Sequence, residues 1–302
     1  MARGVPADRT EDFDRHRALL FSIAYRMLGG VADAEDVVQD AFLRWQKDAG
    51  TEVRSPNAYL SAVVTRLSID HLRREKARRE RYVGPWLPEP LVGETASDAA
   101  ERAVLDESLS MAFLVLLESL TPVERAVFLL REVFDYEYAE ILRLVGKSEA
   151  NCRQISRRAR RSVAARRPRF DPSPEAEERL LRSFLGACMS GDMDALIPLL
   201  SDDVTLWADG GGRVVAARNA IHGPDRVARF LLGILREAPP GLVLRWLPVN
   251  GRPGLVGYFA DGRSQGVVTL DVADGSIRAV RIVVNPEKRE NVPPLPSSLG
   301  VE

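Results

Sequence analysis

The sequence predicts a multidomain chain with two all-α units, the second containing a helix–turn–helix, followed by an α+β domain. Apolar residues recur at helical spacing through most of residues 11–166. From residue 204 onward, short runs rich in β-branched and aromatic residues alternate with glycine-containing turns. Pro-rich segments interrupt both patterns and mark the boundaries. We therefore expect units at 1–84, 99–169 and 175–287, a linker at 85–98 and a tail at 288–302.

Composition places the chain among globular proteins, because 45% of its 302 residues are hydrophobic and 28% are charged. The formal net charge of −1 hides an asymmetry, since residues 121–169 hold 12 basic and 6 acidic residues. Cys152 and Cys188 form neither a disulfide framework nor a metal-ligand spacing. No apolar run reaches the ~18–20 residues of a membrane span. We expect a cytoplasmic protein that uses no metal or cofactor and contacts no membrane.

The first unit reads as three helices. Gly29-Gly30 ends the first, and Asp33 is expected to cap the second, AEDVVQDAFLRWQK, whose acidic residues surround an apolar stripe. Such a face suits either solvent or a basic partner helix. Ser55-Pro56 begins the third helix, which has Asn57 near its start and a strongly basic end. That arrangement suits a DNA strand displaced from a duplex, or simply a basic surface helix.

The second unit contains the most informative segment, EYAEILRLVGKSEANCRQ. A helix that starts at Thr121-Pro122 precedes it. We expect the core of the first helix of the motif at Ala139 and residues 141–145. Gly146 supplies the turn, and Ser148 caps the second helix. Eight arginines and no acidic residue follow between Arg153 and Arg169. Guanidinium groups suit phosphate and guanine contacts, and the early residues of a recognition helix reach base edges in the major groove. The segment therefore predicts duplex DNA binding.

The third unit predicts helices at 175–190 and 192–200, a strand at 204–209, and a helix opened by Gly223-Pro224. Four strands follow, at 242–249, 255–260, 266–273 and 276–284, the last two joined by Asp274-Gly275. An aspartate in an aromatic pocket can act as a general base, yet no second catalytic group is evident, so we expect no catalysis. The candidate pocket or regulatory residues are Trp207, Asp209, Arg213, His222, Trp246, Tyr258, Asn285 and Pro286.

Several motifs along the chain resemble those of extracytoplasmic-function (ECF) RNA polymerase sigma factors. DAEDVVQDAFLRW resembles their polymerase-docking helix, NAYLSAVVTRLSIDHLRREKARR their promoter-melting helix, and LTPVERAVFLLREVFDYEYAEI with SEANCRQISRRARR their promoter-distal helix–turn–helix. The linker WLPEPL with DGGGR at 209–213 and NPEK at 285–288 is similar to a subgroup that adds a SnoaL-like (NTF2-like) cone-shaped α+β barrel. The irregular helix EILRLVGK departs from the usual form of the motif.

The resemblance implies a bacterial initiation factor that binds core RNA polymerase and promoter DNA. Contact between its own C-terminal domain and its sigma domains would modulate its activity. A small molecule is a further candidate ligand of the C-terminal domain. It implies polymerase contacts from the second helix, at Asp33, Glu35, Asp36, Val37, Gln39, Asp40 and Phe42. Base capture would fall to Asn57, and strand contacts near the −10 element to Arg66, Arg73, Arg74 and Lys76. Contacts to the −35 duplex would come from Ser148, Asn151, Arg153, Gln154, Arg157, Arg158 and Arg161.

Two alternatives remain open at this stage. A ligand-sensing helix–turn–helix regulator would hold its effector in the barrel and bind duplex DNA without polymerase, usually as a dimer on a palindrome. A cyclase- or isomerase-type enzyme would use Asp209 in the barrel and leave the basic helices unexplained.

Overall fold

The computed structural model describes residues 7–48, 53, 55–93, 109–165 and 174–295. The chain forms two compact units. The helical unit comprises residues 1–80, 96–109 and 113–167, and the sheet unit comprises 81–95, 110–112 and 168–302. The part of the expected linker that the structure describes thus belongs with the C-terminal sheet. The remainder of that linker at 94–98, residues 99–108 of the next expected helix, and the end of the tail at 296–302 lie outside the described residues.

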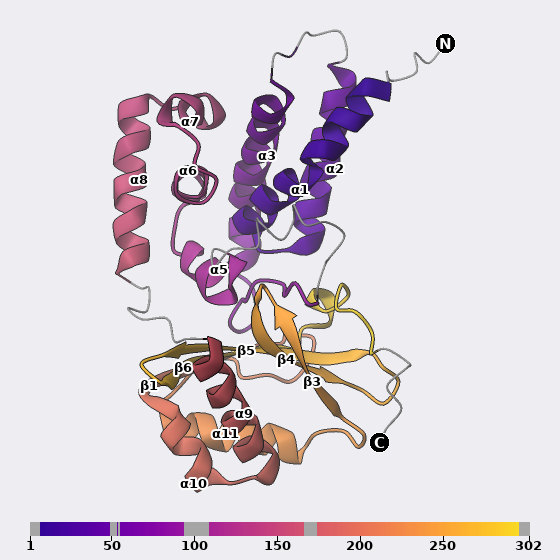
Figure 1. The fold of residues 1–302 in the computed structure, drawn as a ribbon, viewed down its shortest axis with the longest axis vertical. Coiled ribbons are helices and arrows are strands. Elements are labelled where there is room, and N and C mark those ends of the chain that lie inside the picture. Colours follow the sequence, from indigo (N-terminus) through magenta and orange to yellow (C-terminus); the bar gives the residue numbers. More distant parts are fainter. Residues whose placement is uncertain (1–6, 49–52, 54, 94–108, 166–173, 296–302) are drawn as a thin grey trace. The chain divides into compact units, whose positions relative to one another are not determined.

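The N-terminal part of the helical unit consists of α1 (Ala7–Leu28), α2 (Val31–Lys47) and α3 (Pro56–Arg79), which pack side by side (Figure 1). The α1 helix ends where Gly29 adopts a φ of 73°, as its sequence predicts. The expected cap of α2 was wrong: the helix starts at Val31 and its N-cap is Gly30, which has no side-chain cap bond. Asp33 lies inside the first turn instead, because Val31 and Ala32 extend the helix toward the glycine pair. Its carboxylate still meets the positive end of the helix dipole.

The rest of the helical unit contains most of α5 (Met111–Leu117) and all of α6 (Pro122–Glu132), α7 (Tyr138–Val145) and α8 (Glu149–Ala164). Thr121 and Glu124 form a capping box at the start of α6. Gly146 takes a φ of 65° between α7 and α8, and the Ser148 side chain accepts from the Asn151 amide. The helix–turn–helix is therefore confirmed. Its buried core is formed by Val127, Leu130, Ile141, Leu144, Cys152 and Ile155, whereas Ala139, which was expected there, is exposed.

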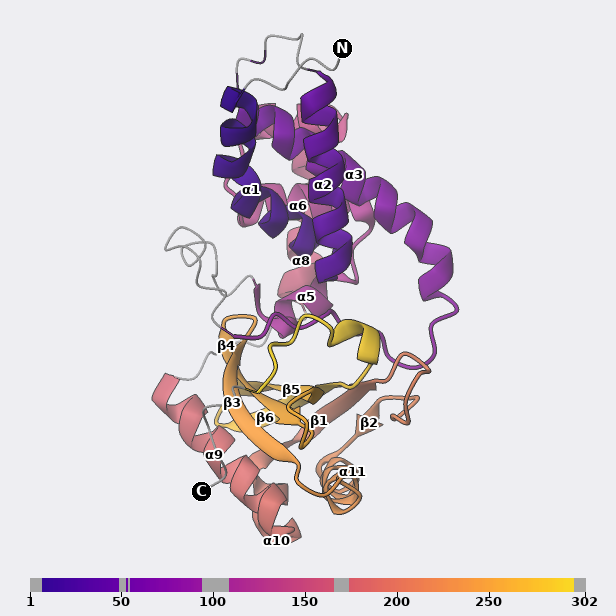
Figure 2. The ribbon, with the colours of Figure 1, turned by 90° about the vertical axis from the view of Figure 1, so that its right-hand side faces the viewer.

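The sheet unit is a curved six-stranded sheet in the order β2-β1-β6-β5-β4-β3 (Figure 2). Its β1 and β6 strands run parallel, while the other neighbouring pairs are antiparallel. The short β2 strand has no counterpart among the predicted strands. The bounds are α9 Pro174–Ser190, α10 Met193–Leu196, η2 Ile197–Leu199, β1 Leu200–Asp209, β2 Ile221–His222, α11 Pro224–Arg236, β3 Val243–Val249, β4 Arg252–Tyr258, β5 Ser264–Ala273, β6 Ser276–Val283 and η3 Pro286–Lys288.

The two faces of this sheet bury different partners. The larger core, which includes Leu206, Val280 and Ile282, packs against Phe184 of α9 and Leu231 of α11. The smaller cluster on β3–β5 contains Val256, Tyr258 and Val267 together with Val92 and Val292, which come from the two segments outside the sheet. We call residues 81–93 the linker segment. It is part of the fold of the sheet unit, because its Val92 completes an apolar cluster there.

Hydrogen bonds fix the same segment to the loop between β3 and β4. Val92 forms an isolated bridge with Val249. The Asn250 amide donates to the Leu91 carbonyl at 2.8 Å, and the Leu91 amide donates to Asn250 Oδ1 at 3.1 Å. In the described part of the chain, no helix is both long and apolar enough to cross a membrane. Those same residues include no cluster of three or more His, Cys, Asp or Glu side chains suited to a metal ion.

Candidate polymerase, DNA and regulatory sites

The outward face of α2 combines acid and apolar surface. Asp36, Gln39 and Asp40 are exposed at helical spacing, and Leu43 beside them is 44% exposed. Sequence reasoning missed Leu43, although its i+3 spacing from Asp40 was a usable signal. Two of the expected polymerase-contact residues pack inside the helical unit instead. Val37 is buried, and the centre of the Phe42 ring lies 4.9 Å from that of Phe13.

The other two acidic residues expected at this site are paired within the helical unit. Arg17 Nη2 lies 2.5 Å from Glu35, and His71 Nε2 lies 3.4 Å from Asp33. Both pairs are partly exposed, so each contributes little to stability. The exposed face of α2 that is open to a partner is therefore centred on Asp36, Gln39, Asp40 and Leu43.

The candidate strand-binding residues of α3 fall into two environments. Arg73 and Arg74 are exposed and contact Asp70 locally, and Lys76 is exposed. Asn57 and Arg66, by contrast, contact the helix–turn–helix. Arg66 donates from Nη2 to the Arg143 carbonyl at 2.6 Å and from Nε to the Leu144 carbonyl at 3.1 Å.

Helix α8 presents an arginine-rich surface. Gln154, Arg157, Arg158 and Arg161 are exposed, while Asn151 near the helix start is half-buried. Arg153 is partly occupied, because its Nη2 lies 2.5 Å from Glu149 and its guanidinium lies 4.6 Å from the centre of the Tyr138 ring. Arg160, on a different side of the helix, pairs with Glu132 at 2.7 Å. The exposed set lies on the side opposite the buried residues Cys152, Ile155 and Ala159, as a groove-reading helix requires.

In the sheet unit, Asp209 is the centre of the candidate regulatory site. It ends β1 and is fully buried. Its Oδ1 accepts from the Tyr82 hydroxyl at 2.6 Å and from the Gly211 amide at 3.1 Å. Its Oδ2 accepts from the Leu87 amide at 2.8 Å and from Lys288 Nζ at 2.7 Å. With four donors and no solvent access, this carboxylate is not available as a general base.

Lys288 joins three segments at this carboxylate. Besides Asp209, its ammonium group donates to the Leu87 carbonyl at 2.5 Å and lies 4.2 Å from the Trp86 ring and 5.0 Å from the Tyr82 ring. Aromatic faces and a buried carboxylate are the surroundings that hold a desolvated ammonium group. Neither Tyr82 nor Lys288 was singled out from the sequence, although WLPEPL and NPEK were recognised as unusual loops.

Asn285 and Gly211 complete the junction. Asn285 is buried, caps η3 by accepting from the Glu287 amide at 3.1 Å, and donates from Nδ2 to the Tyr82 hydroxyl at 2.9 Å. Burial and the hydrogen bond to Asp209 raise the pKa of Tyr82 well above its ordinary value, so that hydroxyl remains a donor. Gly211 has a φ of 60°, and a Cβ there would lie 2.4 Å from Asn285 Nδ2. We name Tyr82, Leu87, Asp209, Gly211, Asn285 and Lys288 the linker clasp.

The structure separates the other candidate residues from the linker clasp. Tyr258 is buried in the cluster with Val92, and Trp246 is 37% exposed. The guanidinium of Arg281 lies 5.4 Å from the Trp207 ring, and His222 contacts the Thr205 hydroxyl at 3.1 Å. Arg213 sits at the edge of the clasp and pairs with Glu287 at 2.7 Å, in the turn that starts at Pro286.

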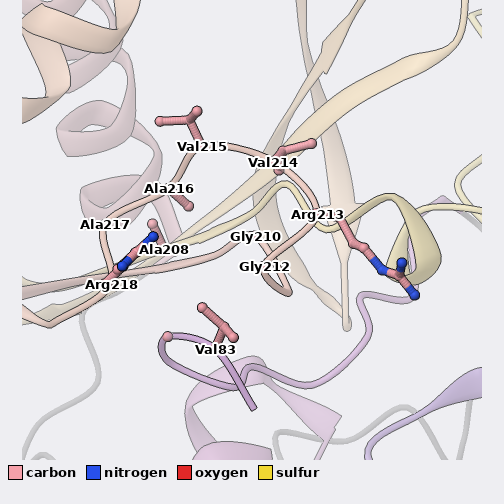
Figure 3. Close-up of a pocket in the computed structure, with 11 residues that line it drawn as sticks. Val83, Ala208, Gly210, Gly212, Arg213, Val214, Val215, Ala216, Ala217 and Arg218 are labelled. Atoms are coloured by element: carbon pink, nitrogen blue, oxygen red, sulfur yellow. The ribbon is translucent and has the colours of Figure 1, made fainter.

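A cavity of about 550 Å³ lies beside the clasp (Figure 3). Val83 and Gly84 form one side, and the loop that follows β1 forms the other. Three exposed apolar residues line this cavity, Val83, Val214 and Val215. The side chain of Arg213 points toward the 286–288 turn, where it pairs with Glu287. Within the described part of the chain, Arg213 is the single candidate pocket residue that lines it; the full lining is Val83, Gly84, Ala208, Gly210, Gly212, Arg213, Val214, Val215, Ala216, Ala217 and Arg218.

A helix–turn–helix with an arginine-lined second helix, joined to a three-helix unit with an acidic face, defines a DNA-binding protein of transcription. Family comparison identifies both helical parts. Residues 13–78 match the Sigma-70 region 2 family and residues 110–163 match the Sigma-70 region 4 family.

Comparison with known proteins extends the match to nearly the whole chain. The ECF RNA polymerase sigma factor SigJ of Mycobacterium tuberculosis is 39% identical over 290 residues, 92% of each chain. A probable ECF sigma factor of the same species, SigI, is 33% identical over 287 residues, 94% of this chain and 95% of that one. The crystal structure of M. tuberculosis SigJ superposes with a TM-score of 0.78 at 36% identity, covering 95% of this chain and 100% of that one.

The chain belongs to the ECF RNA polymerase sigma factors. It is a promoter-specific initiation factor that acts with core RNA polymerase, and the family is not catalytic. The predicted layout of two helical sigma domains followed by an α+β sheet domain is confirmed. The enzyme alternative built on Asp209 is not supported, since four donors surround its buried carboxylate.

Proposed function

We propose that this sigma factor docks on polymerase through the exposed face of α2 and reads promoter DNA through α3 and α8. The exposed Asp36, Gln39, Asp40 and Leu43 would meet a basic and apolar helical surface of the polymerase. Asn57, Arg66, Arg73, Arg74 and Lys76 would hold the opened strand near the −10 element. The exposed residues early on α8 would read the −35 duplex, where such a helix reaches base edges. Initiation takes place in the bacterial cytoplasm, where we place the protein.

We further propose that the sheet unit regulates the sigma domains by holding the segment that connects them. The observation that supports this is the linker clasp, in which residues 82–87 and 285–288 converge on the buried Asp209. Segment 81–93 continues from α3, the candidate strand-binding helix, so its attachment limits how the sigma domains can move. Linker docking would thus set the arrangement in which the sigma domains meet DNA.

Run-off transcription with purified core polymerase and a promoter library tests both proposals. The full chain should give promoter-dependent transcripts, and Lys288→Met should change their amount by releasing the clasp. Arg213→Ala, which removes an exposed pair beside the clasp, is the matched control. Transcripts from the wild type with no difference between Lys288→Met and Arg213→Ala would reject regulation through the clasp. A wild type that stimulates no transcription would reject the polymerase and promoter roles.

The cavity beside the clasp is the proposed place for a small-molecule ligand. Its support is the exposed apolar group Val83, Val214 and Val215, with Val83 contributed by the linker segment. A ligand there would touch the linker and the loop after Asp209 together. A small-molecule screen by thermal shift should yield compounds that stabilise the wild type and not Val83→Asp. Hits that stabilise both equally would place the ligand elsewhere.

A further inference from the structure

One face of α3 lies against the helix–turn–helix within the helical unit. The Tyr136 hydroxyl, in the loop between α6 and α7, donates to Ser61 Oγ at 2.8 Å and lies 3.3 Å from Asn57 Oδ1. Ser61 in turn donates to Asn57 Oδ1 at 3.1 Å and is fully buried. Asn57 and Ser61 share one side of α3, since they are four residues apart, while Ala62 and Arg66, also four apart, lie on the adjoining side.

Apolar packing joins this face to the core of the helix–turn–helix. Ala62 of α3 packs against the cluster that contains Val127, Ile141 and Leu144. Burial raises the pKa of Tyr136 above its ordinary value, as expected for a hydroxyl removed from water at such a seam. The contact is therefore a packed interface, with a small residue at its centre and polar groups at both ends.

Arg66 closes the other end of the interface. Its Nε and Nη2 donate to the carbonyls of Leu144 and Arg143, in the last turn of α7. The carbonyls at a helix C-terminus carry partial negative charge and lack intrahelical donors, so a guanidinium satisfies them well. A DNA phosphate offers the same guanidinium a full negative charge and the same bidentate geometry. Arg66 cannot direct the same two N–H groups at both partners.

We propose that this face of α3 is a shared binding surface on which the helix–turn–helix and the opened promoter strand exclude each other. The inference rests on the proposed roles of Asn57 and Arg66 in strand binding. In the free chain, Tyr136 and the end of α7 occupy the surface. In the initiation complex, the single strand takes their place, so that the helix–turn–helix must leave α3 first. The exposed arginines of α8 lie outside this interface and are available to duplex DNA in both states.

The variant Tyr136→Phe tests the proposal with little disturbance, because it keeps the ring and removes only the hydroxyl, which donates to Ser61 and lies 3.3 Å from Asn57 Oδ1. Tyr138→Phe is the matched control, since it removes the hydroxyl of a neighbouring tyrosine and keeps the ring that contacts the guanidiniums of Arg131 and Arg153. Dyes attached to Asp14→Cys in α1 and Ala164→Cys in α8 would report the distance between the three-helix part and the helix–turn–helix by energy transfer in the full chain. The native Cys152 and Cys188 are buried and stay unlabelled.

Loss of one hydrogen bond should shift the closed-to-open ratio by roughly 2- to 10-fold toward open. Tyr136→Phe should therefore lower energy transfer in the free chain and raise run-off transcription at limiting polymerase by a similar factor, while Tyr138→Phe matches the wild type. Adding core polymerase with promoter DNA, chosen from the wild-type library, should lower energy transfer in every version. Arg66→Lys, measured by energy transfer alone, should open the free chain as well, because it keeps the charge and loses the two-carbonyl contact.

Unchanged energy transfer in both Tyr136→Phe and Arg66→Lys would overturn the closed state. Lower energy transfer with unchanged transcription would overturn the exclusion between the helix–turn–helix and the strand. Thermal unfolding of each variant checks that the helical unit remains folded. If the wild type itself fails to transcribe with core polymerase, the proposed function fails, whereas the energy-transfer comparison still decides whether α3 is covered in the free chain.

Discussion

The ammonium group of Lys288 lies 2.7 Å from the carboxylate of Asp209, which solvent does not reach. Asp209 is the last residue of β1, and Lys288 is the last residue of η3, which follows β6, the strand parallel to β1. Between them the two residues hold Tyr82 and Leu87 of the linker segment. The pair is therefore both a structural element of the sheet unit and the point where that unit holds the connection between the sigma domains.

Removing the lysine should strongly destabilise the sheet unit. Lys288→Met leaves the buried Asp209 charge without its cation, and breaking one partner of a buried pair costs about 3–5 kcal/mol. Urea unfolding should show a loss of this size. Arg213→Ala, which breaks an exposed pair, should cost about 1 kcal/mol or less. An equal loss of unfolding free energy in the two variants would contradict the larger stabilising role of the buried pair.

The linker clasp should weaken only in strong base. Burial and the bond to Asp209 raise the pKa of Tyr82 in the folded chain, so its stabilisation is complete below the unfolded value and is lost as pH rises through the folded one. The stability difference between the wild type and Tyr82→Phe should be constant from about pH 6 to 9 and shrink above about pH 10. A difference that already falls at neutral pH would argue against a protonated Tyr82 donor.

Gly211 should tolerate no side chain. Gly211→Ala places a Cβ at a left-handed φ, at about 1–2 kcal/mol, and drives it into Asn285 at 2.4 Å. Gly275→Ala is the matched control, because its φ of 73° is also left-handed and nothing lies within 4 Å of its Cβ. Thermal unfolding should lower the Tm of Gly211→Ala more than that of Gly275→Ala. Similar shifts would mean that backbone strain alone explains the cost.

On α8, exposed and paired arginines should differ in their effect on DNA binding. Arg157→Ala should weaken promoter binding by about 1–3 kcal/mol and relax specificity at one base pair, as loss of a base contact does. Arg160→Ala should have little effect on DNA, since Arg160 pairs with Glu132. Fluorescence anisotropy of holoenzyme on promoter DNA and a single-substituted set measures both. Uniform weakening on all sequences would reassign Arg157 to a phosphate contact.

The thiol of Cys188 should be inert in the native protein. Burial raises its pKa to about 12, so little thiolate forms at pH ~8, and the side chain is shielded from reagent. Iodoacetamide should leave Cys188 unmodified in buffer and alkylate it in urea, as read by mass spectrometry. Rapid alkylation without denaturant would indicate that α9 opens from the sheet.

Much of the fold could be predicted because its signals are local. The starts of α3, α6 and α8 follow from Ser55-Pro56, Thr121-Pro122 and Ser148, whose side chains cap the helix that follows them. The Asp274-Gly275 turn between β5 and β6 follows from its tolerance of positive φ. The start of α2 was misplaced because Gly30, which lacks a capping side chain, takes the role expected of Asp33.

The sequence by itself determined the family, the order of the domains and the arginine-rich exposed face of α8, since these depend on helical spacing, caps and charge within short segments. Only the tertiary structure decided that residues 82–93 belong to the sheet unit, that Asp209 is held by four donors, and that Tyr136 covers Asn57 and Ser61. Apart from the Gly211 amide next to Asp209, these relationships join residues about 75 to 200 positions apart. Such pairings follow from how sheets and helices close in space rather than from any local preference of the chain.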